Sequence, residues 1–236
     1  MTLRLLPLGD SLTCGTFWSE QGADGPGPQG GYRAALEHLL LAAGNDFTFV
    51  GDQCRWSAGM RHPRHQGLGG WTLRHILEGH AAAGFAITVP VAELVARLRP
   101  DAVLLLAGAN DVHEDLDAAA ICARLAAVVR AIASAVPACR ILVGTPLPRT
   151  VGPFGRGGCY QSTAAHVAVT AVLGPAVTAL VATLAEEGLP VLLTPTALAV
   201  RDAERDLVDH LHPDLATLAR LADQWYVCLV ASGLAC

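Results

Sequence analysis

The sequence predicts an α/β fold: a three-layer α/β/α sandwich with a central, mostly parallel five-stranded sheet. Segments of strand and helix character alternate along the chain, which is the pattern of successive strand–helix–strand units. The run Ala102–Ala107 is continuously apolar, as is typical of a parallel strand buried on both faces. Hydrophobic residues make up 52% of the 236 positions and charged residues 16%, so we expect one large core and a single domain over residues 1–236.

Short apolar runs bounded by turn residues define the expected strands. These are Thr2–Leu8, Phe47–Val50, Ala102–Ala107, Arg140–Val143 and Val191–Leu193. Helical spacing of apolar residues defines the expected helices, which are Tyr32–Ala43, Val89–Leu98, Ala118–Val136, Thr163–Glu187 and Pro213–Ser232, with Trp71–Gly79 as the opening of another. Pro213 suits the first turn of the closing helix because its fixed φ is helical and it lacks an N–H.

Charge and hydropathy narrow the class of partner. The formal net charge is −5 and Lys and Arg form no cluster, which argues against nucleic acid or an anionic membrane surface. The segment Ser162–Ala185 has no Asp, Glu, Lys or Arg and is long enough to span a membrane. It is rich in Ala, Thr and Val and contains Gly174-Pro175, which favours a helix buried in a soluble core. The sequence does not predict an oligomeric state.

Seven cysteines are scattered along the chain without a CxxC pair, so we interpret them mostly as small apolar residues. Disulfides in an exported protein are the alternative. His62 and His65 flank a Pro-Arg pair in a loop and lack the spacing of metal ligands, so no metal or cofactor is expected. The first strand begins almost at Met1; if Met1 is the natural start we expect a cytoplasmic protein, and if a signal peptide has been removed, a secreted one.

The stretch Gly9–Gly15 follows the first predicted strand and contains Asp10 and Ser11. A serine at the carboxyl end of a parallel strand lies at the sheet edge where open α/β folds bind ligands. Because Gly, Asp and Ser also form ordinary turns, this stretch alone does not decide between a nucleophile and a turn.

Two further segments fall at the same predicted edge. The glycine cluster Gly67–Gly70 lets the backbone approach a ligand and leaves N–H groups free to donate, although a flexible loop has the same composition. Gly108–Asp111 ends the most buried strand, and there the Asn110 amide can point into the crevice as a donor. The alternative is a strand-end turn in which Asp111 caps the following helix.

Asp209 and His212 stand three positions apart just before the last predicted helix. On a turn, the carboxylate can hold the imidazole Nδ1–H and leave Nε2 free to take a proton. A serine hydroxyl is a poor nucleophile without such a base. His210 competes for the role, but its position next to Asp209 makes the turn geometry less natural.

These four blocks, in this order from residue 9 to residue 213, resemble the SGNH (GDSL-type) hydrolases. The resemblance implies a flavodoxin-like sandwich, with Ser11 as nucleophile, His212 as general base and Asp209 orienting it. It also implies an oxyanion hole formed by the Ser11 N–H, the Gly70 N–H and the Asn110 amide. The blocks remain weak individually, and their order is what carries the resemblance.

Three further stretches, Gly30–Arg33, Phe49–Gly51 and His65–Thr72, look like the acetyl xylan esterases of carbohydrate esterase family three. This resemblance implies a serine esterase that removes a small acyl group, with acetyl favoured, from a carbohydrate or other polyol. An acyltransferase or a thioesterase or lipase-type hydrolase is the alternative, and a non-catalytic binding protein is a third.

Candidate substrate-binding residues are Asp10, Trp71 and Asp111, which adjoin the predicted nucleophile and oxyanion donors. Trp71 and Trp18 are hypothesised to line the crevice as an aromatic wall against a sugar, with packing in the core as the alternative. The expected partner is a small-molecule or carbohydrate ester.

Overall fold

The computed structural model describes residues 2–15, 30–81, 88–154, 158 and 160–236. Its central sheet has the strand order β2-β1-β4-β5-β8, and all neighbours are parallel. The strands are β1 (Leu3–Gly9), β2 (Phe47–Phe49), β4 (Ala102–Leu106), β5 (Arg140–Gly144) and β8 (Val191–Thr194). A short strand, β3 (Gln66–Gly67), adds to the carboxyl end of β1. The predicted parallel sheet is confirmed, and β3 is an addition to it.

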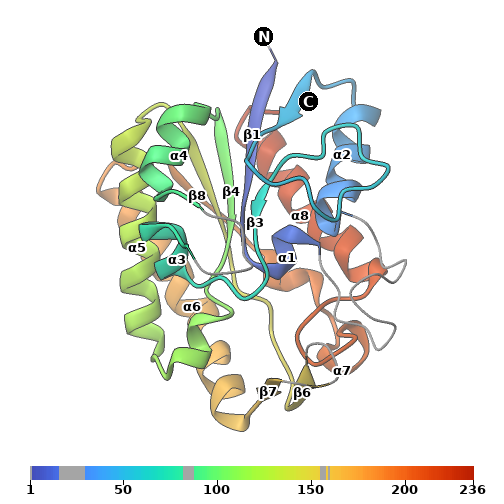
Figure 1. The fold of residues 1–236 in the computed structure, drawn as a ribbon, viewed down its shortest axis with the longest axis vertical. Coiled ribbons are helices and arrows are strands. Elements are labelled where there is room, and N and C mark those ends of the chain that lie inside the picture. The colour runs from blue at the N-terminus through green and yellow to red at the C-terminus, as the bar shows by residue number, and fades with distance from the viewer. Residues whose placement is uncertain (1, 16–29, 82–87, 155–157, 159) are drawn as a thin grey trace.

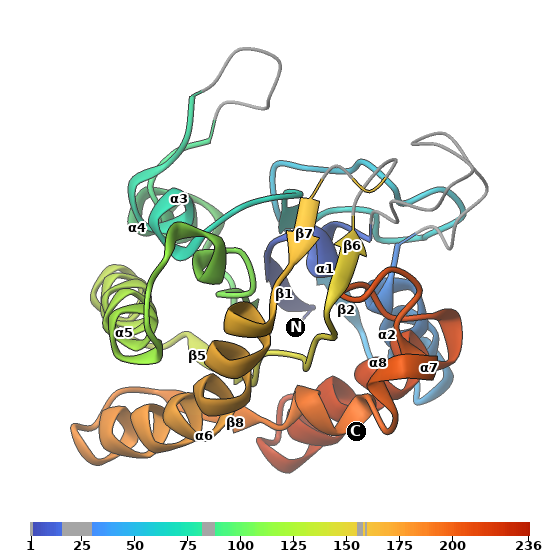
Figure 2. The same ribbon diagram turned by 90° about the horizontal axis from the view of Figure 1, so that it is seen from below.

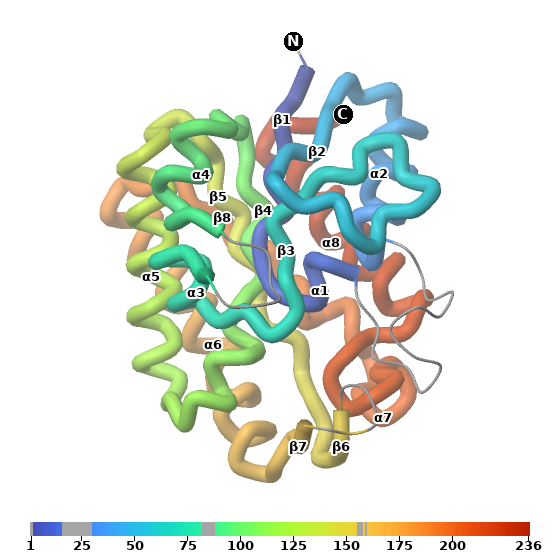
Figure 3. Tube along the Cα trace, in the orientation of Figure 1, coloured from blue at the N-terminus to red at the C-terminus, as the bar shows by residue number. Residues whose placement is uncertain are grey.

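Helices cover both faces of the sheet (Figures 1 and 3). One face is covered by α3 (Leu73–Glu78), α4 (Val91–Leu98), α5 (Ala118–Ala135) and α6 (Ala164–Glu186), and the other by α2 (Tyr32–Ala42) and α8 (Leu215–Ala231). Successive residues of β4 alternate between the two layers: Val103 and Leu105 belong to the first core, and Leu104 and Leu106 to the second. This alternation makes the sheet the middle layer of the sandwich.

The long helix α6, which spans most of the uncharged segment and ends at Glu186, is less buried than expected. It buries one stripe only, formed by Thr170, Leu173, Val177, Val181 and Leu184, because it packs on the sheet from outside rather than inside the core. By length and composition alone, α5 and α6 are both long and apolar enough to cross a membrane. They pack against each other and, with the sheet, form part of the same apolar core.

The closing helix begins later than expected. Pro213 does not lie in its first turn, because residues Leu207 and Pro213 form an antiparallel bridge. Instead Asp214 caps α8 by accepting the Thr217 N–H at 2.8 Å. Elements that the sequence did not predict are α1 (Ser11–Cys14), η1 (Asp111–Glu114), β6 (Gly152–Phe154), β7 (Tyr160–Ser162), η3 (Thr196–Ala199) and α7 (Ala203–Asp206).

The carboxyl ends of the strands form one edge of the sheet, where α1 follows β1, and this edge faces the end of the molecule that holds α7 and the antiparallel β6–β7 pair (Figure 1). Seen from below, the hairpin crosses in front of β1 and α1 (Figure 2). Two glycines let backbones meet at this edge. A Cβ on Gly9 would lie 2.0 Å from Leu106 O, and one on Gly67 would lie 2.5 Å from Cys14 N. The turn after β1 therefore packs directly against its neighbouring strands.

We expect Gly67→Ala to destabilise the fold by about 1–3 kcal/mol, because its new methyl group meets fixed backbone rather than a mobile side chain. Gly44→Ala is the matched control. Gly44 has φ +77° and open space around it, so it should lose only the conformational cost of about 1 kcal/mol. Urea unfolding of both variants measures the difference. Equal losses would contradict the close contact between β3 and α1.

Candidate active site

Ser11 is the first residue of α1 and follows β1 after a single-residue turn at Asp10. Asp10 caps the short helix, since its Oδ1 accepts the Leu12 N–H at 3.0 Å. Gly15 closes it in the left-handed conformation, φ +80°, and donates its N–H to Ser11 O. The serine side chain is thereby fixed at the carboxyl edge of the sheet, with 6% of the residue exposed.

His212 lies against this serine from the other end of the chain. Its Nε2 is 2.9 Å from Ser11 Oγ, and its Nδ1 is 2.8 Å from Asp209 Oδ2. Asp209 Oδ1 also accepts the His212 main-chain N–H at 2.7 Å, which closes the turn on itself. Because a carboxylate only accepts, the proton lies on Nδ1 and Nε2 faces the serine hydroxyl as an acceptor. The arrangement can move a proton from Ser11 Oγ to His212.

His210, the competing histidine, is held elsewhere. Its Nδ1 is 2.8 Å from Thr150 Oγ1, and its ring fills the space above Gly152, where a Cβ would lie 2.3 Å from Nε2. His210 has φ +66°, an uncommon conformation for a residue other than glycine. It therefore ties the turn that carries His212 to the segment that leads into the hairpin.

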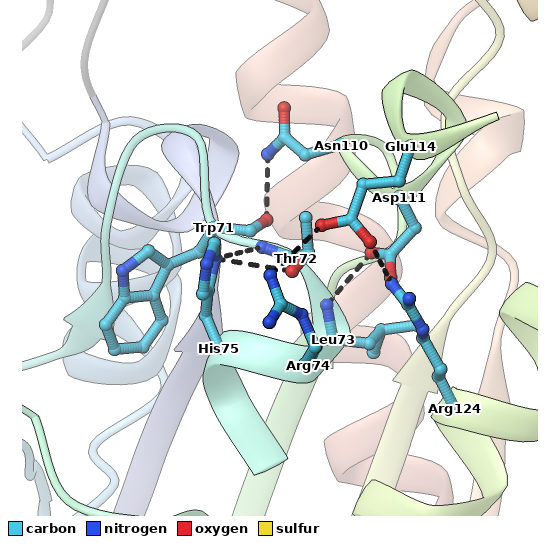
Figure 4. A network of polar contacts seen from close by, with 9 residues as sticks. All are labelled: Trp71, Thr72, Leu73, Arg74, His75, Asn110, Asp111, Glu114 and Arg124. Carbon is cyan, nitrogen blue, oxygen red and sulfur yellow. Dashed lines mark hydrogen bonds and ion pairs between the residues drawn. The ribbon is translucent and has the colours of Figure 1, made fainter. Parts of the chain in front are cut away.

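The candidate oxyanion donors follow adjacent strands. Ser11 follows β1, Gly70 follows β3 and Asn110 follows β4. Within the described part of the chain, neither the Ser11 N–H nor the Gly70 N–H makes a hydrogen bond. Asn110 Nδ2 donates one proton to Trp71 O at 2.9 Å, which links its loop to the glycine cluster and leaves the second amide proton to donate elsewhere (Figure 4).

Asp111, expected to bind substrate, has both carboxylate oxygens engaged by protein groups. The residue is fully buried, and its Oδ2 accepts the Leu73 N–H at 2.9 Å (Figure 4). Its Oδ1 pairs with Arg124 at 2.9 Å. Asp111 thus accepts the first main-chain N–H of α3, whose N-cap is Thr72, whereas the alternative interpretation had it capping the helix that follows it in sequence.

Trp71, expected to line the crevice, is 4% exposed and belongs to the core under α3, where the alternative interpretation had placed it. What Trp71 offers the site is its main-chain carbonyl, the acceptor for Asn110. Trp18, the other proposed wall residue, lies outside the described residues.

Asp10, the third expected substrate-binding residue, is also buried. Burial raises the pKa of Asp10 to about 6, although the Leu12 N–H and the charge of His212 both favour the carboxylate. Its Oδ2 has no hydrogen-bond partner in the described structure. Asp10 is a buried, titratable group directly beside the nucleophile.

Two buried residues that the sequence did not single out for the site hold the backbone around it. Arg33 Nε donates to Thr13 O at 2.7 Å and its Nη2 to Cys14 O at 3.0 Å, which secures the end of α1. His65 Nδ1 accepts the Gly67 N–H at 3.0 Å, and burial lowers the pKa of His65 to about 3. His65, expected to be a loop residue, is buried and bridges to Gln53 immediately before β3.

Among the described residues, no group of three or more His, Cys, Asp or Glu side chains is arranged to hold a metal ion. The six described cysteines form no disulfide: Cys14 and Cys139 are buried, Cys122 and Cys228 are half-buried, and Cys54 and Cys236 are exposed. The interpretation of the cysteines as buried apolar residues thus fits some of them only. Cys159 lies outside the described residues.

Asp10→Asn should flatten the pH dependence of stability. The pKa of Asp10 is about 6 in the folded protein against an ordinary value of 3.8, so folding favours its protonated form. That contribution is fully present below the unfolded pKa and is lost as pH rises through 6, about 3 kcal/mol in all. Between about pH 4 and pH 7, urea unfolding should show the wild type losing more stability than Asp10→Asn. Parallel curves would contradict the buried state of Asp10.

Known proteins similar to this chain include esterases. The curated relative matched is a multidomain esterase from Ruminococcus flavefaciens, 30% identical over 122 residues. That match covers 47% of this chain, and the chain spans only 15% of the length of the relative. Among solved structures, a family 3 carbohydrate esterase from Clostridium thermocellum has a TM-score of 0.73 at 22% identity, with 100% of each chain covered. One from Talaromyces cellulolyticus has a TM-score of 0.72 at 20% identity, with 98% of each covered.

These structural likenesses show the fold. The sequence profile of the GDSL-like lipase/acylhydrolase family matches residues 8–219, which begins just before Ser11 and ends just beyond His212. The chain belongs to the GDSL-like lipase/acylhydrolase family.

Proposed function

We propose that the chain is a serine carboxylic ester hydrolase that removes a small acyl group, acetyl, from a carbohydrate or other polyol through an acyl-serine intermediate. The observation that carries the proposal is the continuous chain of contacts from Ser11 Oγ to His212 Nε2, 2.9 Å, and from His212 Nδ1 to Asp209, 2.8 Å. A nucleophile, a base within hydrogen-bond reach and a group that orients the base together define acyl transfer.

Acylation begins when His212 Nε2 takes the Ser11 proton as Oγ forms a bond to the ester carbonyl carbon. The carbonyl oxygen becomes an oxyanion, for which the Ser11 N–H, the Gly70 N–H and the Asn110 amide are the donors. When the intermediate collapses, the bond from carbon to the alcohol oxygen breaks and His212 returns the proton to the departing alcohol. Asp209 stabilises the imidazolium between these transfers and keeps its Nδ1–H oriented.

Deacylation repeats the sequence with water in place of the serine hydroxyl. His212 takes a proton from water, the hydroxyl attacks the acyl carbon and Ser11 leaves with the proton that His212 returns. Each donor of the hole is worth about 3–4 kcal/mol of transition-state stabilisation, because the donors are already in place when the charge develops.

The proposed substrate class rests on the relatives. Family 3 carbohydrate esterases share the fold over nearly the whole chain, another similar structure is an acetyl esterase, and the curated relative is an esterase. We propose small esters, and neither nucleic acid nor membrane, as the partners of this chain. Its net charge of −5 supports the first exclusion.

Ser11→Ala should lower the rate of p-nitrophenyl acetate hydrolysis by about 10³-fold or more, because it removes the hydroxyl that lies 2.9 Å from the base His212. Ser134→Ala, on the exposed side of α5, is the matched control and should keep the wild-type rate. Release of acetate from acetylated xylose and xylan should depend on Ser11 in the same way. Retention of the rate in Ser11→Ala would overturn the mechanism.

The same assay distinguishes the alternatives. A rate that rises with acyl chain length, or that favours thioesters, would replace the acetyl esterase with a lipase-type hydrolase or a thioesterase. Transfer of acetyl to an added alcohol in preference to water would identify an acyltransferase. We expect acetate release to exceed both.

A further inference from the structure

Arg149 is a buried arginine to which the reaction steps above assign no role. It lies in the segment between β5 and β6 at the carboxyl edge of the sheet and is 4% exposed. Its Nη2 donates to Ala109 O at 2.6 Å and its Nη1 to His113 Nε2 at 3.1 Å. Arginine is rarely this buried, and both of these acceptors are uncharged. The nearby Asp10 carboxylate favours the charged guanidinium.

The two acceptors bracket Asn110. Ala109 O belongs to the peptide that carries the Asn110 N–H, so a bond to it fixes the plane of that peptide. His113 lies three residues later, and its own N–H donates to Asn110 O at 3.0 Å. Burial and the neighbouring guanidinium lower the pKa of His113 to about 4, which keeps the imidazole neutral. Because a guanidinium only donates, Nε2 is the nitrogen that accepts. Arg149 thus holds the loop on both sides of the candidate oxyanion donor.

Thr150, the next residue, contacts the turn that carries the base His212. Its N–H donates to His210 O at 3.1 Å, and its Oγ1 lies 2.8 Å from His210 Nδ1. His210 is in the turn that closes between Asp209 and His212. Adjacent side chains of one segment therefore contact the loop of the oxyanion donor and the turn of the base.

We propose that Arg149 is a positioning residue of the oxyanion hole, which acts through Ala109 and His113 to hold the Asn110 amide in place. This inference rests on the proposed serine esterase function. Arg149 does not contact the substrate. Its charge also reaches the nucleophile region, since it favours the carboxylate of Asp10, the residue before Ser11.

A double-mutant cycle tests the route through Asn110. Asn110→Ala alone should lower kcat for p-nitrophenyl acetate by about 10²–10³-fold. Arg149→Met alone should lower kcat by about 10–100-fold with KM nearly unchanged, because misplacing a donor removes stabilisation of the transition state only. In the Asn110→Ala background, Arg149→Met should cost less than about 3-fold, because the donor it positions is already gone.

Two further variants control the cycle. Arg130→Met removes the same groups from an exposed arginine that pairs with Glu187, and should keep the wild-type kcat. Thr150→Val removes the hydroxyl that contacts His210 in the turn from Asp209 to His212. Because this turn holds the base and not the oxyanion donor, the fold-loss in kcat from Thr150→Val should be the same in the wild-type and Asn110→Ala backgrounds. If Arg149→Met does not fold, Arg149→Lys replaces it in the cycle: lysine keeps the charge but not both donors, and its loss in kcat should likewise vanish in the Asn110→Ala background.

Equal losses from Arg149→Met, or from Arg149→Lys in its place, in the wild-type and Asn110→Ala backgrounds would overturn the positioning role. An unchanged kcat in the single variant would do the same. Both outcomes leave the proposed function standing, because the wild type still hydrolyses esters through Ser11. Absence of any Ser11-dependent hydrolysis in the wild type would overturn the proposed function and this inference with it.

Discussion

The hydrogen bond between Ser11 and His212 joins residues that stand 201 positions apart, and the fold is organised so that it can form. Ser11 leaves β1, which lies inside the sheet between β2 and β4. His212 precedes α8, which packs on α2 and the same sheet face. The antiparallel bridge between Leu207 and Pro213 joins the two ends of the loop that carries His212. Because no local segment contains both groups, the reaction depends on the whole sandwich being assembled.

Loops at the carboxyl edge of the sheet lack the regular hydrogen bonds of strands and helices. Buried arginines donate hydrogen bonds to main-chain carbonyls of these loops instead. Arg33 binds the carbonyls at the end of α1, and Arg149 binds the carbonyl before Asn110. A guanidinium has five donors in a rigid plane, so one side chain can satisfy several main-chain acceptors at once. Burial lowers the pKa of both to about 10, which leaves them charged at neutral pH. The same arginine–carbonyl hydrogen bonds therefore stabilise these loops and hold the site residues in position.

The features that the sequence predicted are those set by local pattern. Apolar runs and helical spacing gave the sheet and most helices, and the turn from Asp209 to His212 is encoded within four residues. Features set by distant partners were missed. Its position next to Asn110 suggested that Asp111 binds substrate. Its hydrogen-bond partner, the Leu73 N–H, lies 38 positions away and could not be inferred from the local sequence. The short β6–β7 pair contains Pro153 and no alternating apolar run, so nothing local marked it as a hairpin.

The central claim is that His212, oriented by Asp209, activates Ser11. Labelling with a fluorophosphonate, which reacts with activated serines, tests it most directly when the modified peptide is identified by mass spectrometry. The wild type should carry the label on Ser11, His212→Ala should remain unlabelled, and Asp209→Asn should be labelled much more slowly while all three remain folded. Labelling of another residue, or labelling of Ser11 at the wild-type rate in folded His212→Ala, would contradict the account.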